Sequence, residues 1–241
     1  MVKSFSLVMP CYNEAQSLPA LVKRAVDCAK KRCLAPNEFE LVLVENGSKD
    51  NSFAVMESLK KDEDGSYLKI VRVLKNEGYG NGLFQGLKAT CHEVVGYTHA
   101  DEQCDPDDVF QGWALISKQP GKKVLIKGTR HERAFRDRVI SRGFELIASA
   151  LFLTNLHEIN AQPKVFSAEL LSVLTQPPKD FAFDLYILLQ AKQHGYRFLE
   201  IPVLFPPRKH GQSNWASTFR SKTRTILKML GYMFRYRLKL I

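Results

Sequence analysis

The feature that most constrains the fold is the alternation of strand-like and helix-like segments along the first half of the chain. Residues 39–44 (FELVLV) form a largely apolar run, which is typical of a strand buried on both faces of a sheet. Residues 17–33 instead place their apolar side chains at helical spacing. Such alternation predicts right-handed βαβ units and a parallel sheet. Ligands of these sheets bind beyond the carboxyl ends of the strands, which are therefore the first place to look for a site.

The remaining helices and strands are predicted in the same way, from apolar runs, from apolar residues at helical spacing, and from residues that typically start helices. Asp50 and Asp105-Pro106 stand where helix caps are expected. We expect strands at 4–9, 39–44, 68–74, 94–98, 124–127 and 197–204, an extended segment at 159–166, and helices at 17–33, 51–61, 82–91, from 106, 137–153 and 181–194. The predicted fold is α/β, with one domain over residues 1–213, a mostly parallel central sheet, and a helical extension over residues 214–241.

Length and cysteine content are compatible with a single domain in a reducing compartment. The chain has 241 residues, of which 45% are hydrophobic and 25% charged. Its five cysteines are an odd number without zinc-ligand spacing, so we expect free thiols and a cytoplasmic location. Residues 2–9 are too short for a secretory signal, and no run approaches the roughly 20 apolar residues of a membrane span.

The net charge of +10 is concentrated near the C-terminus, which favours a partner surface. Apolar side chains are mixed with these bases, so the segment 217–240 could lie in a membrane interface. Packing on the domain or on a twin subunit remains an equal alternative. Nucleic acid is not an expected partner, because the chain has no recognition motif and no basic platform interleaved with aromatic residues. The bases are Arg220, Lys222, Arg224, Lys228, Arg235, Arg237 and Lys239.

Polar side chains follow four of the expected strands where these strands end. The four segments are 9–14 (MPCYNE), 45–52 (ENGSKDNS), 76–82 (NEGYGNG) and 99–106 (HADEQCDP). Amide and carboxylate groups there could bind a base or ribose, and glycines could bring backbone amides close to a diphosphate. Each segment alone also suits an ordinary strand–turn–helix corner, and the glycines match neither a Walker loop nor a dinucleotide fingerprint.

The fourth strand end offers a candidate metal site. His99, Asp101 and Gln103 alternate along the chain, so their side chains project to one side and could converge on one cation. Mg²⁺ prefers oxygen ligands, whereas Mn²⁺ also accepts an imidazole, so His99 favours Mn²⁺.

Taken together, the ordered motifs resemble glycosyltransferase family 2, closest to the dolichyl- or polyprenyl-phosphate mannose synthase branch. The resemblance runs from residue 10 to residue 213 and includes Lys127-Gly128-Thr129-Arg130, Arg138, Ser141, residues 158–166 (EINAQPKVF), Phe183-Asp184, residues 200–203 (EIPV) and residues 208–213 (RKHGQS). It implies a GT-A fold, a nucleoside-diphosphate sugar donor linked to GDP or UDP, a divalent metal, and hexose transfer with inversion.

The resemblance also assigns roles to individual residues. Asp101 would be the principal metal ligand, assisted by His99 and Gln103. Arg130, Arg138, Arg208 and Lys209 would contact phosphate, because guanidinium groups bind phosphate bidentately. The donor would contact Pro10, Tyr12, Asn13, Glu14, Glu45, Asn46, Gly47, Asn76, Gly80 and Ala100.

Departures from the family pattern leave the acceptor open. Glu45-Asn46 stands where the family has two aspartates, His99 replaces the first metal-site aspartate, and Gln162-Pro163 replaces Gly-Phe. A lipid-phosphate acceptor, reached at the cytoplasmic face of a membrane, needs no general base. A glycan or other hydroxyl acceptor needs one, and Glu158 or Asp184 are the candidates. A non-catalytic nucleotide-sugar-binding protein and a homodimer are further alternatives.

Overall fold

A seven-stranded sheet with helices on both faces makes up the protein. The computed structural model describes residues 4–119, 121–131, 135–206 and 219–239. The strands are β1 (Phe5–Cys11), β2 (Phe39–Asn46), β3 (Leu68–Val73), β4 (Val94–Tyr97), β5 (Val124–His131), β6 (Lys164–Ser167) and β7 (Arg197–Leu204). The helices are α1 (Leu18–Lys31), α2 (Ser52–Lys61), α3 (Tyr79–Lys88), α4 (Pro106–Ser117), α5 (Phe135–Phe152), α6 (Phe183–Gln193) and α7 (Phe219–Lys239), and two 3-10 helices are η1 (Glu63–Tyr67) and η2 (Ala168–Val173).

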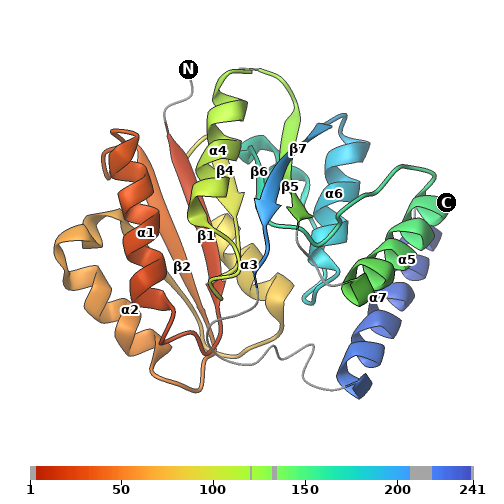
Figure 1. The fold of residues 1–241 in the computed structure, drawn as a ribbon, viewed down its shortest axis with the longest axis horizontal. Coiled ribbons are helices and arrows are strands. Elements are labelled where there is room, and N and C mark those ends of the chain that lie inside the picture. The colour runs from red at the N-terminus through yellow and green to blue at the C-terminus, as the bar shows by residue number, and fades with distance from the viewer. Residues whose placement is uncertain (1–3, 120, 132–134, 207–218, 240–241) are drawn as a thin grey trace.

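The strand order is β3-β2-β1-β4-β6-β5-β7. Strands β3, β2, β1 and β4 are parallel to one another, and β7 is parallel to β5. Strand β6 runs antiparallel to both of its neighbours, β4 and β5. The expected α/β fold with a mostly parallel sheet is therefore confirmed, and the carboxyl ends of β1, β2 and β4 meet at one edge, the lower edge in Figure 1.

Alternate residues of the central strands pack into two separate hydrophobic cores, one on each face of the sheet. In β1, Leu7 and Met9 pack with α1 and α4 on one face, whereas Val8 packs with α3 on the other face. Helices α5, α6 and α7 contribute to this second core. Both faces of β1 and β2 are thus covered, which explains why their sequences are almost continuously apolar.

Helix α3 begins at Tyr79, three residues before the expected start, because its glycines are packing positions. A Cβ atom at Gly82 would lie 2.6 Å from the side chain of Asn46, and one at Gly80 would collide with the carbonyl oxygen of Pro178. Gly78, with φ +125°, provides the turn into the helix. The expected segment 159–166 is a strand only from Lys164.

The C-terminal part of the described chain is helical. Met229 and Met233 of α7 are buried, and Tyr236 packs against Phe152 of α5. The two helices lie side by side, remote from α1 and α2 (Figure 1). Within the described ranges, no helix has both the length and the apolar character that a membrane span requires. The expected domain boundary at 213/214 lies outside the described residues.

Candidate functional site

The loops after β1 and β2 hold each other through side chain–backbone hydrogen bonds. Asn13 has a left-handed backbone (φ 57°), its N–H donates to Ser48 Oγ (3.2 Å), and its Oδ1 accepts from the N–H of Lys49 (2.8 Å). The N–H of Glu14 donates to Ser52 Oγ (2.9 Å). The two strand-end segments predicted to contact the donor are therefore joined in the fold.

Asp50 contributes to the same junction. One of its carboxylate oxygens accepts from the N–H of Ala15 (3.1 Å), and the other accepts from the N–H of Ser52 (3.0 Å). Partial burial opposes ionisation of Asp50, but a hydrogen bond from the Ser52 hydroxyl (2.5 Å), together with the two backbone hydrogen bonds, lowers its pKa. The expected cap at Asp50 thus serves α2 from one residue before the position where the structure places the N-cap, Asn51.

Glu45 and Asn46 end β2 and connect this junction to the glycine-rich segment. Both side chains are buried. Glu45 Oε1 accepts from the N–H of Ser48 (2.5 Å), and Asn46 Nδ2 donates to the carbonyl oxygen of Gly78 (3.2 Å). Among the described residues, Asn46 Oδ1 has no partner. A buried acceptor without a donor is a candidate contact for a ligand hydroxyl or N–H group.

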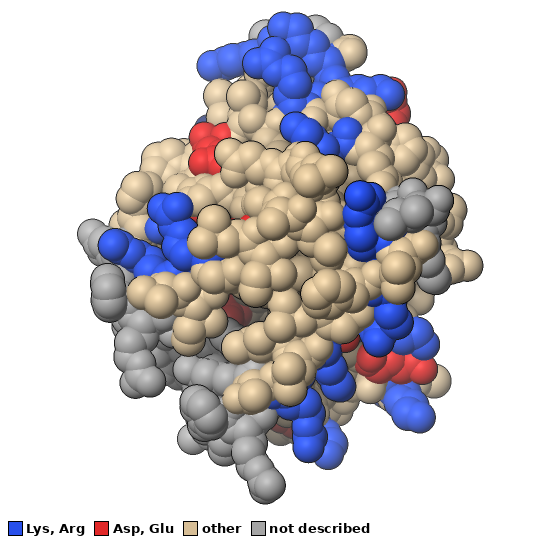
Figure 2. All heavy atoms as spheres, turned by 90° about the vertical axis from the view of Figure 1, so that its right-hand side faces the viewer, with Lys and Arg blue, Asp and Glu red and all other residues tan. Residues whose placement is uncertain are grey.

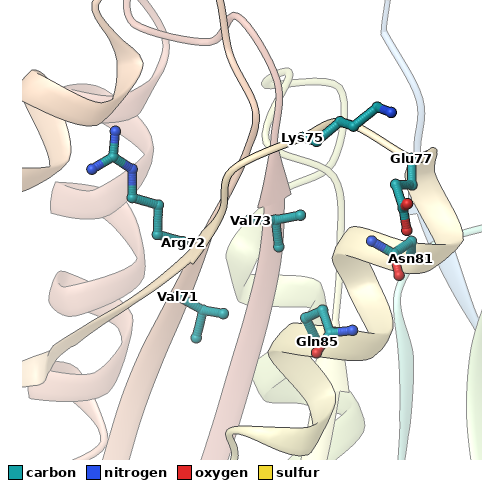
Figure 3. A pocket seen from close by; sticks show the side chains of 7 residues that line it. All are labelled: Val71, Arg72, Val73, Lys75, Glu77, Asn81 and Gln85. Atoms are coloured by element: carbon teal, nitrogen blue, oxygen red, sulfur yellow. The ribbon is translucent and has the colours of Figure 1, made fainter.

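The turn at Gly47 brings the second and third strand ends together. Gly47 has φ +68°, and a Cβ atom there would lie 2.5 Å from the backbone nitrogen of Asn76. Asn76 in turn accepts from the N–H of Gly78 (2.9 Å). Beside this segment, at the outer edge of β3, lies a hollow of about 340 Å³ (Figure 3). The hollow is lined by Val71, Arg72, Val73, Lys75, Glu77, Asn81 and Gln85.

The segment after β4 carries two buried carboxylates. Asp101 is 6% exposed, its Oδ1 accepts from the N–H of Gln103 (3.1 Å), and Glu102 beside it is also buried, with φ 59°. Burial and then the charge of Asp101 raise the pKa of Cys104 to about 12. Glu102 was not among the predicted residues. In an extended strand, neighbouring side chains point to opposite sides, so Glu102 was expected to point away from Asp101. The left-handed backbone at Glu102 breaks this pattern.

Two of the three predicted metal ligands, Gln103 and His99, also have contacts within the protein. Gln103 Nε2 donates to the carbonyl oxygen of Pro206 (2.8 Å), and the His99 ring packs 5.7 Å from the ring of Tyr79. Among the described residues, the only trio of His, Cys, Asp and Glu ligands within reach of one ion is Glu40, Cys91 and His92. That trio lies at the amino ends of the strands, away from Asp101. Asp101 and Glu102 fit a divalent cation whose remaining ligands come from phosphate or water, which is the usual arrangement for Mg²⁺.

Arg130 and Glu158 form an ion pair at the end of β5. Arg130 Nε lies 2.6 Å from Glu158 Oε2, and both side chains are less than a tenth exposed. The guanidinium also lies over the ring of Phe205. The N–H of Glu158 donates to Glu145 Oε1 (2.9 Å), and burial together with the charge of Glu158 raises the pKa of Glu145.

Asp184 is the centre of a buried polar network. Its Oδ1 accepts from Lys164 Nζ (2.6 Å), from the Tyr97 hydroxyl (2.8 Å) and from Gln162 Nε2 (3.1 Å), and the side chain is 3% exposed. Burial lowers the pKa of Lys164, although Asp184 opposes this shift. Gln162 also donates to the hydroxyl of Tyr79, the residue that packs on His99. The network therefore extends from α6 to the segment that carries Asp101.

The chain matches the model of glycosyl transferase family 2 over residues 6–174. It belongs to this family. The matched range includes β2 to β6, nearly all of β1, and every predicted site residue except Asp184, Arg208 and Lys209.

Two curated relatives carry the same name, undecaprenyl-phosphate 4-deoxy-4-formamido-L-arabinose transferase. The protein from Proteus mirabilis (strain HI4320) is 24% identical over 219 residues, which is 89% of this chain and 64% of the relative. The protein from Yersinia pestis (strain Pestoides F) is 23% identical over 217 residues, 89% of this chain and 63% of the relative. The family 2 chain thus spans slightly less than two thirds of the length of these relatives.

Solved structures share the fold. Glucosyl-3-phosphoglycerate synthase from Mycobacterium tuberculosis, crystallised with Mn²⁺, UDP and its product, has a TM-score of 0.68 at 17% identity and covers 98% of this chain and 80% of that chain. Mannosyl-3-phosphoglycerate synthase from Rubrobacter xylanophilus has a TM-score of 0.72 at 16% identity and covers 97% and 73%. The GT-A fold expected from the sequence is confirmed.

In this family 2 chain, the structure brings together one group of predicted residues and separates others from it. Asn13, Glu14, Asn46, Gly47 and Asn76 belong to the joined loops, whereas Asp184 and Glu158 lie in buried networks. Pro10 and Tyr12 are partly exposed at the end of β1, and Ala100 is buried beside Asp101. Arg138 is exposed on α5. Arg208 and Lys209 lie outside the described residues.

Proposed function

We propose that this family 2 chain transfers a hexose from a nucleoside-diphosphate sugar to a polyprenyl phosphate, with inversion at the anomeric carbon. The observation that carries the donor side is the junction of the β1 and β2 ends beside the buried Asp101. The acceptor is proposed from the curated relatives, which are named as undecaprenyl-phosphate transferases.

The donor would lie along the edge formed by the ends of β1, β2 and β4. Asn46 Oδ1 is a buried acceptor without a partner in the described structure and suits a base or ribose donor group. The loops of Asn13 and Gly47 are fixed before the donor arrives, so little conformational entropy is lost when it binds. Both GDP- and UDP-linked sugars fit this proposal.

A divalent cation would be held by Asp101, with Glu102 beside it and His99 at the entrance of the same segment. When bound, such a cation neutralises the charge that develops on the departing diphosphate. The imidazole of His99 favours Mn²⁺ over Mg²⁺. The hydrogen bond that the backbone N–H of Gln103 donates to Asp101 orients the carboxylate for this role.

A phosphate acceptor removes the need for a general base, because it is already an anion near neutral pH. This agrees with the surroundings of both candidate bases. Glu158 is paired with Arg130, and Asp184 accepts three hydrogen bonds inside the core. We assign both residues to positioning: Glu158 orients Arg130, and Asp184 supports β4 and β6. Arg130, Arg138 and Arg208 are proposed to contact phosphate groups.

The proposed place of action is the cytoplasmic face of a membrane, where a polyprenyl phosphate presents its head group. The test is an assay with radiolabelled GDP- and UDP-hexoses, Mn²⁺ and polyprenyl phosphate in detergent. Label should pass into the solvent-extractable lipid, and Asp101→Asn should stop the transfer, whereas Asp27→Asn on the exposed face of α1 should not. Donor binding without any transfer would favour a non-catalytic nucleotide-sugar-binding protein instead.

A further inference from the structure

A second group of metal-ligating side chains lies at the amino ends of the strands, whereas Asp101 lies at the carboxyl ends. It consists of Glu40 in β2 and of Cys91 and His92, which precede β4. One ligand atom from each residue lies within 4.8 Å of the ligand atoms of the other two. The proposed sugar transfer uses none of these three residues, so the group needs an explanation of its own.

Glu40 is a buried carboxylate that the fold holds in one position. Its Oε1 accepts from the Ser6 hydroxyl (2.6 Å) and from the N–H of Cys91 (2.8 Å). Ser6 is fully buried and lies opposite Glu40 in the register of β1 and β2. Burial opposes ionisation of Glu40, but these hydrogen bonds lower its pKa. The carboxylate is therefore charged and oriented before any cation arrives.

Cys91 supplies a sulfur ligand next to this carboxylate. Its side chain is exposed, and its thiol donates to Glu40 Oε1 with a sulfur–oxygen distance of 3.2 Å. Ligand atoms around a tetrahedral Zn²⁺ lie about 3.3–3.8 Å apart, as follows from zinc–ligand bonds of roughly 2.0–2.3 Å. The observed distance is close to that separation. A zinc ion bound to both atoms would thus take the place of the thiol proton.

His92 follows Cys91 directly and offers an imidazole nitrogen. Its backbone N–H lies 3.4 Å from the Ser6 hydroxyl oxygen, which holds this part of the chain against β1. Within the described part of the chain, no hydrogen bond or ion pair involves the imidazole ring. Because the ring is only partly buried, rotation about its side-chain bonds brings a nitrogen to the distance that a zinc ion requires.

The base beside the group is Lys69, whose ammonium charge opposes a cation. Lys69 Nζ lies 3.8 Å from Glu40 Oε2, which is too long for a hydrogen bond, and donates instead to the carbonyl oxygen of Ala89 (2.6 Å). Figure 2 shows other Lys and Arg side chains around the side on which α5 and α7 lie, and β2 lies away from that side (Figure 1). Lys69 is therefore the charge whose removal should strengthen cation binding most directly.

We propose that Glu40, Cys91 and His92 bind one Zn²⁺ ion, with water as the fourth ligand. A thiolate, an imidazole and a carboxylate favour zinc over Mg²⁺ and Ca²⁺, which prefer oxygen ligands. Binding releases the thiol proton to solvent. The ion would join the start of β2 to the segment before β4, and sugar transfer would not depend on it.

The test is titration of the full chain with Co²⁺ and Zn²⁺, with Cys33 as the matched control because it is the other exposed cysteine. Cobalt bound to a thiolate absorbs strongly in the near ultraviolet. This absorption should appear in the unchanged protein and in Cys33→Ser, and should be missing in Cys91→Ser. Zinc affinity, measured by calorimetry, should fall by more than about tenfold in Cys91→Ser and His92→Gln, because each loses a ligand. Lys69→Met should bind zinc more tightly than the unchanged protein.

Thermal unfolding distinguishes zinc binding from a purely structural role of the group. Zn²⁺ should raise the unfolding temperature of the unchanged protein and of Cys33→Ser but not that of Cys91→Ser, because an ion that binds the folded state stabilises it. Absence of zinc binding, equal zinc affinities in Cys91→Ser and Cys33→Ser, or cobalt absorption that Cys91→Ser retains would overturn the inference.

Sugar transfer is measured separately in the same variants. Cys91→Ser should transfer sugar to polyprenyl phosphate at the rate of the unchanged protein, and loss of transfer in this variant would contradict the separation of the two sites. Zinc binding that depends on Cys91, in a protein that transfers no sugar, would support the zinc site and reject the proposed function.

Discussion

Asp101 and Asp108 lie seven residues apart, one after β4 and the other in the first turn of α4, and their surroundings differ. Asp101 accepts a hydrogen bond from the backbone of Gln103 and lies beside buried Glu102. Asp108 is half-buried near Asp105 and Asp107, and burial followed by these two charges raises its pKa from 3.8 to about 6. The surroundings of Asp101 suit a metal ligand. Those of Asp108 disfavour its ionised carboxylate.

Replacing Asp101 with asparagine should therefore remove sugar transfer while keeping the fold. We expect turnover to fall by roughly 10²–10³ or more, as for loss of a group that stabilises developing charge. In the unchanged protein, activity after chelation should return better with Mn²⁺ than with Mg²⁺, because His99 is close in sequence. The measurement is initial-rate kinetics with each metal added back, with circular dichroism as the control. Full activity in excess chelator would remove the metal from the mechanism.

Asp108 should make stability fall as pH rises from about 4 to 6. In that interval the folded state binds more protons at this carboxyl than the unfolded state, so the free energy of unfolding decreases with pH. Asp108→Asn lacks this titration, so the variant should gain on the unchanged protein by about 1 kcal/mol between pH 4 and pH 7, after discounting for partial exposure. Urea unfolding at both pH values measures the difference. If the two proteins differed in free energy of unfolding by the same amount at pH 4 and pH 7, the environment of Asp108 would not affect its titration.

Among the elements, β4, β6 and α6 are tied together by the buried pair of Lys164 and Asp184. Lys164 is 0% exposed, and Tyr97 of β4 completes the contact with Asp184. Strand β6 is the antiparallel member of the sheet, placed between β4 and β5. The pair therefore fixes the position at which the parallel half of the sheet, which carries Asp101, meets the second half.

Breaking this pair on one side should cost more stability than removing both partners. Asp184→Asn leaves Lys164 buried and charged, and Lys164→Met leaves Asp184 in the same condition, so each should cost about 3–5 kcal/mol. The double variant should recover part of this loss, because no unpaired charge remains. Free energies of unfolding from a double-mutant cycle measure the coupling. Additive losses would show that the pair is not coupled in the folded protein.

The central strands and most helices could be predicted from the sequence because their signals are local. Residues 39–44 are apolar on both faces, and Asp105-Pro106 caps α4 as expected, with Asp105 accepting from the N–H of Asp107. The start of α3 and the partners of Asp184 depend on contacts between distant residues, such as Gly82 with Asn46 and Tyr97 with Asp184. No local pattern indicates such contacts, so the sequence did not predict the buried network or Glu102. It did predict that Asn13 and Asp101 follow the ends of strands, which is where the structure places them.

At the scale of the whole molecule, α7 is both a packing helix and part of an exposed apolar face. The sequence left these as alternatives, and the structure shows buried Met229 and Met233 on the same helix as exposed Leu227 and Leu238. Helix α7 contributes to the net charge of +10, because its described residues include bases and no acid. One segment can thus contribute to stability and to partner binding through different side chains.

Deleting α7 and changing its outer face should therefore give different results. A chain ending at residue 216 loses the burial of Met229 and Met233 and the contact of Tyr236 with Phe152, so its stability should fall by on the order of 3–5 kcal/mol. Leu227→Gln with Leu238→Gln removes only exposed side chains and should leave the unfolding midpoint within about 0.5 kcal/mol of the original. Both changes should reduce binding to anionic lipid vesicles, but only the deletion should also lower stability in urea. If the substitutions destabilised the protein as much as the deletion, Leu227 and Leu238 would be packed in solution, against protein rather than lipid.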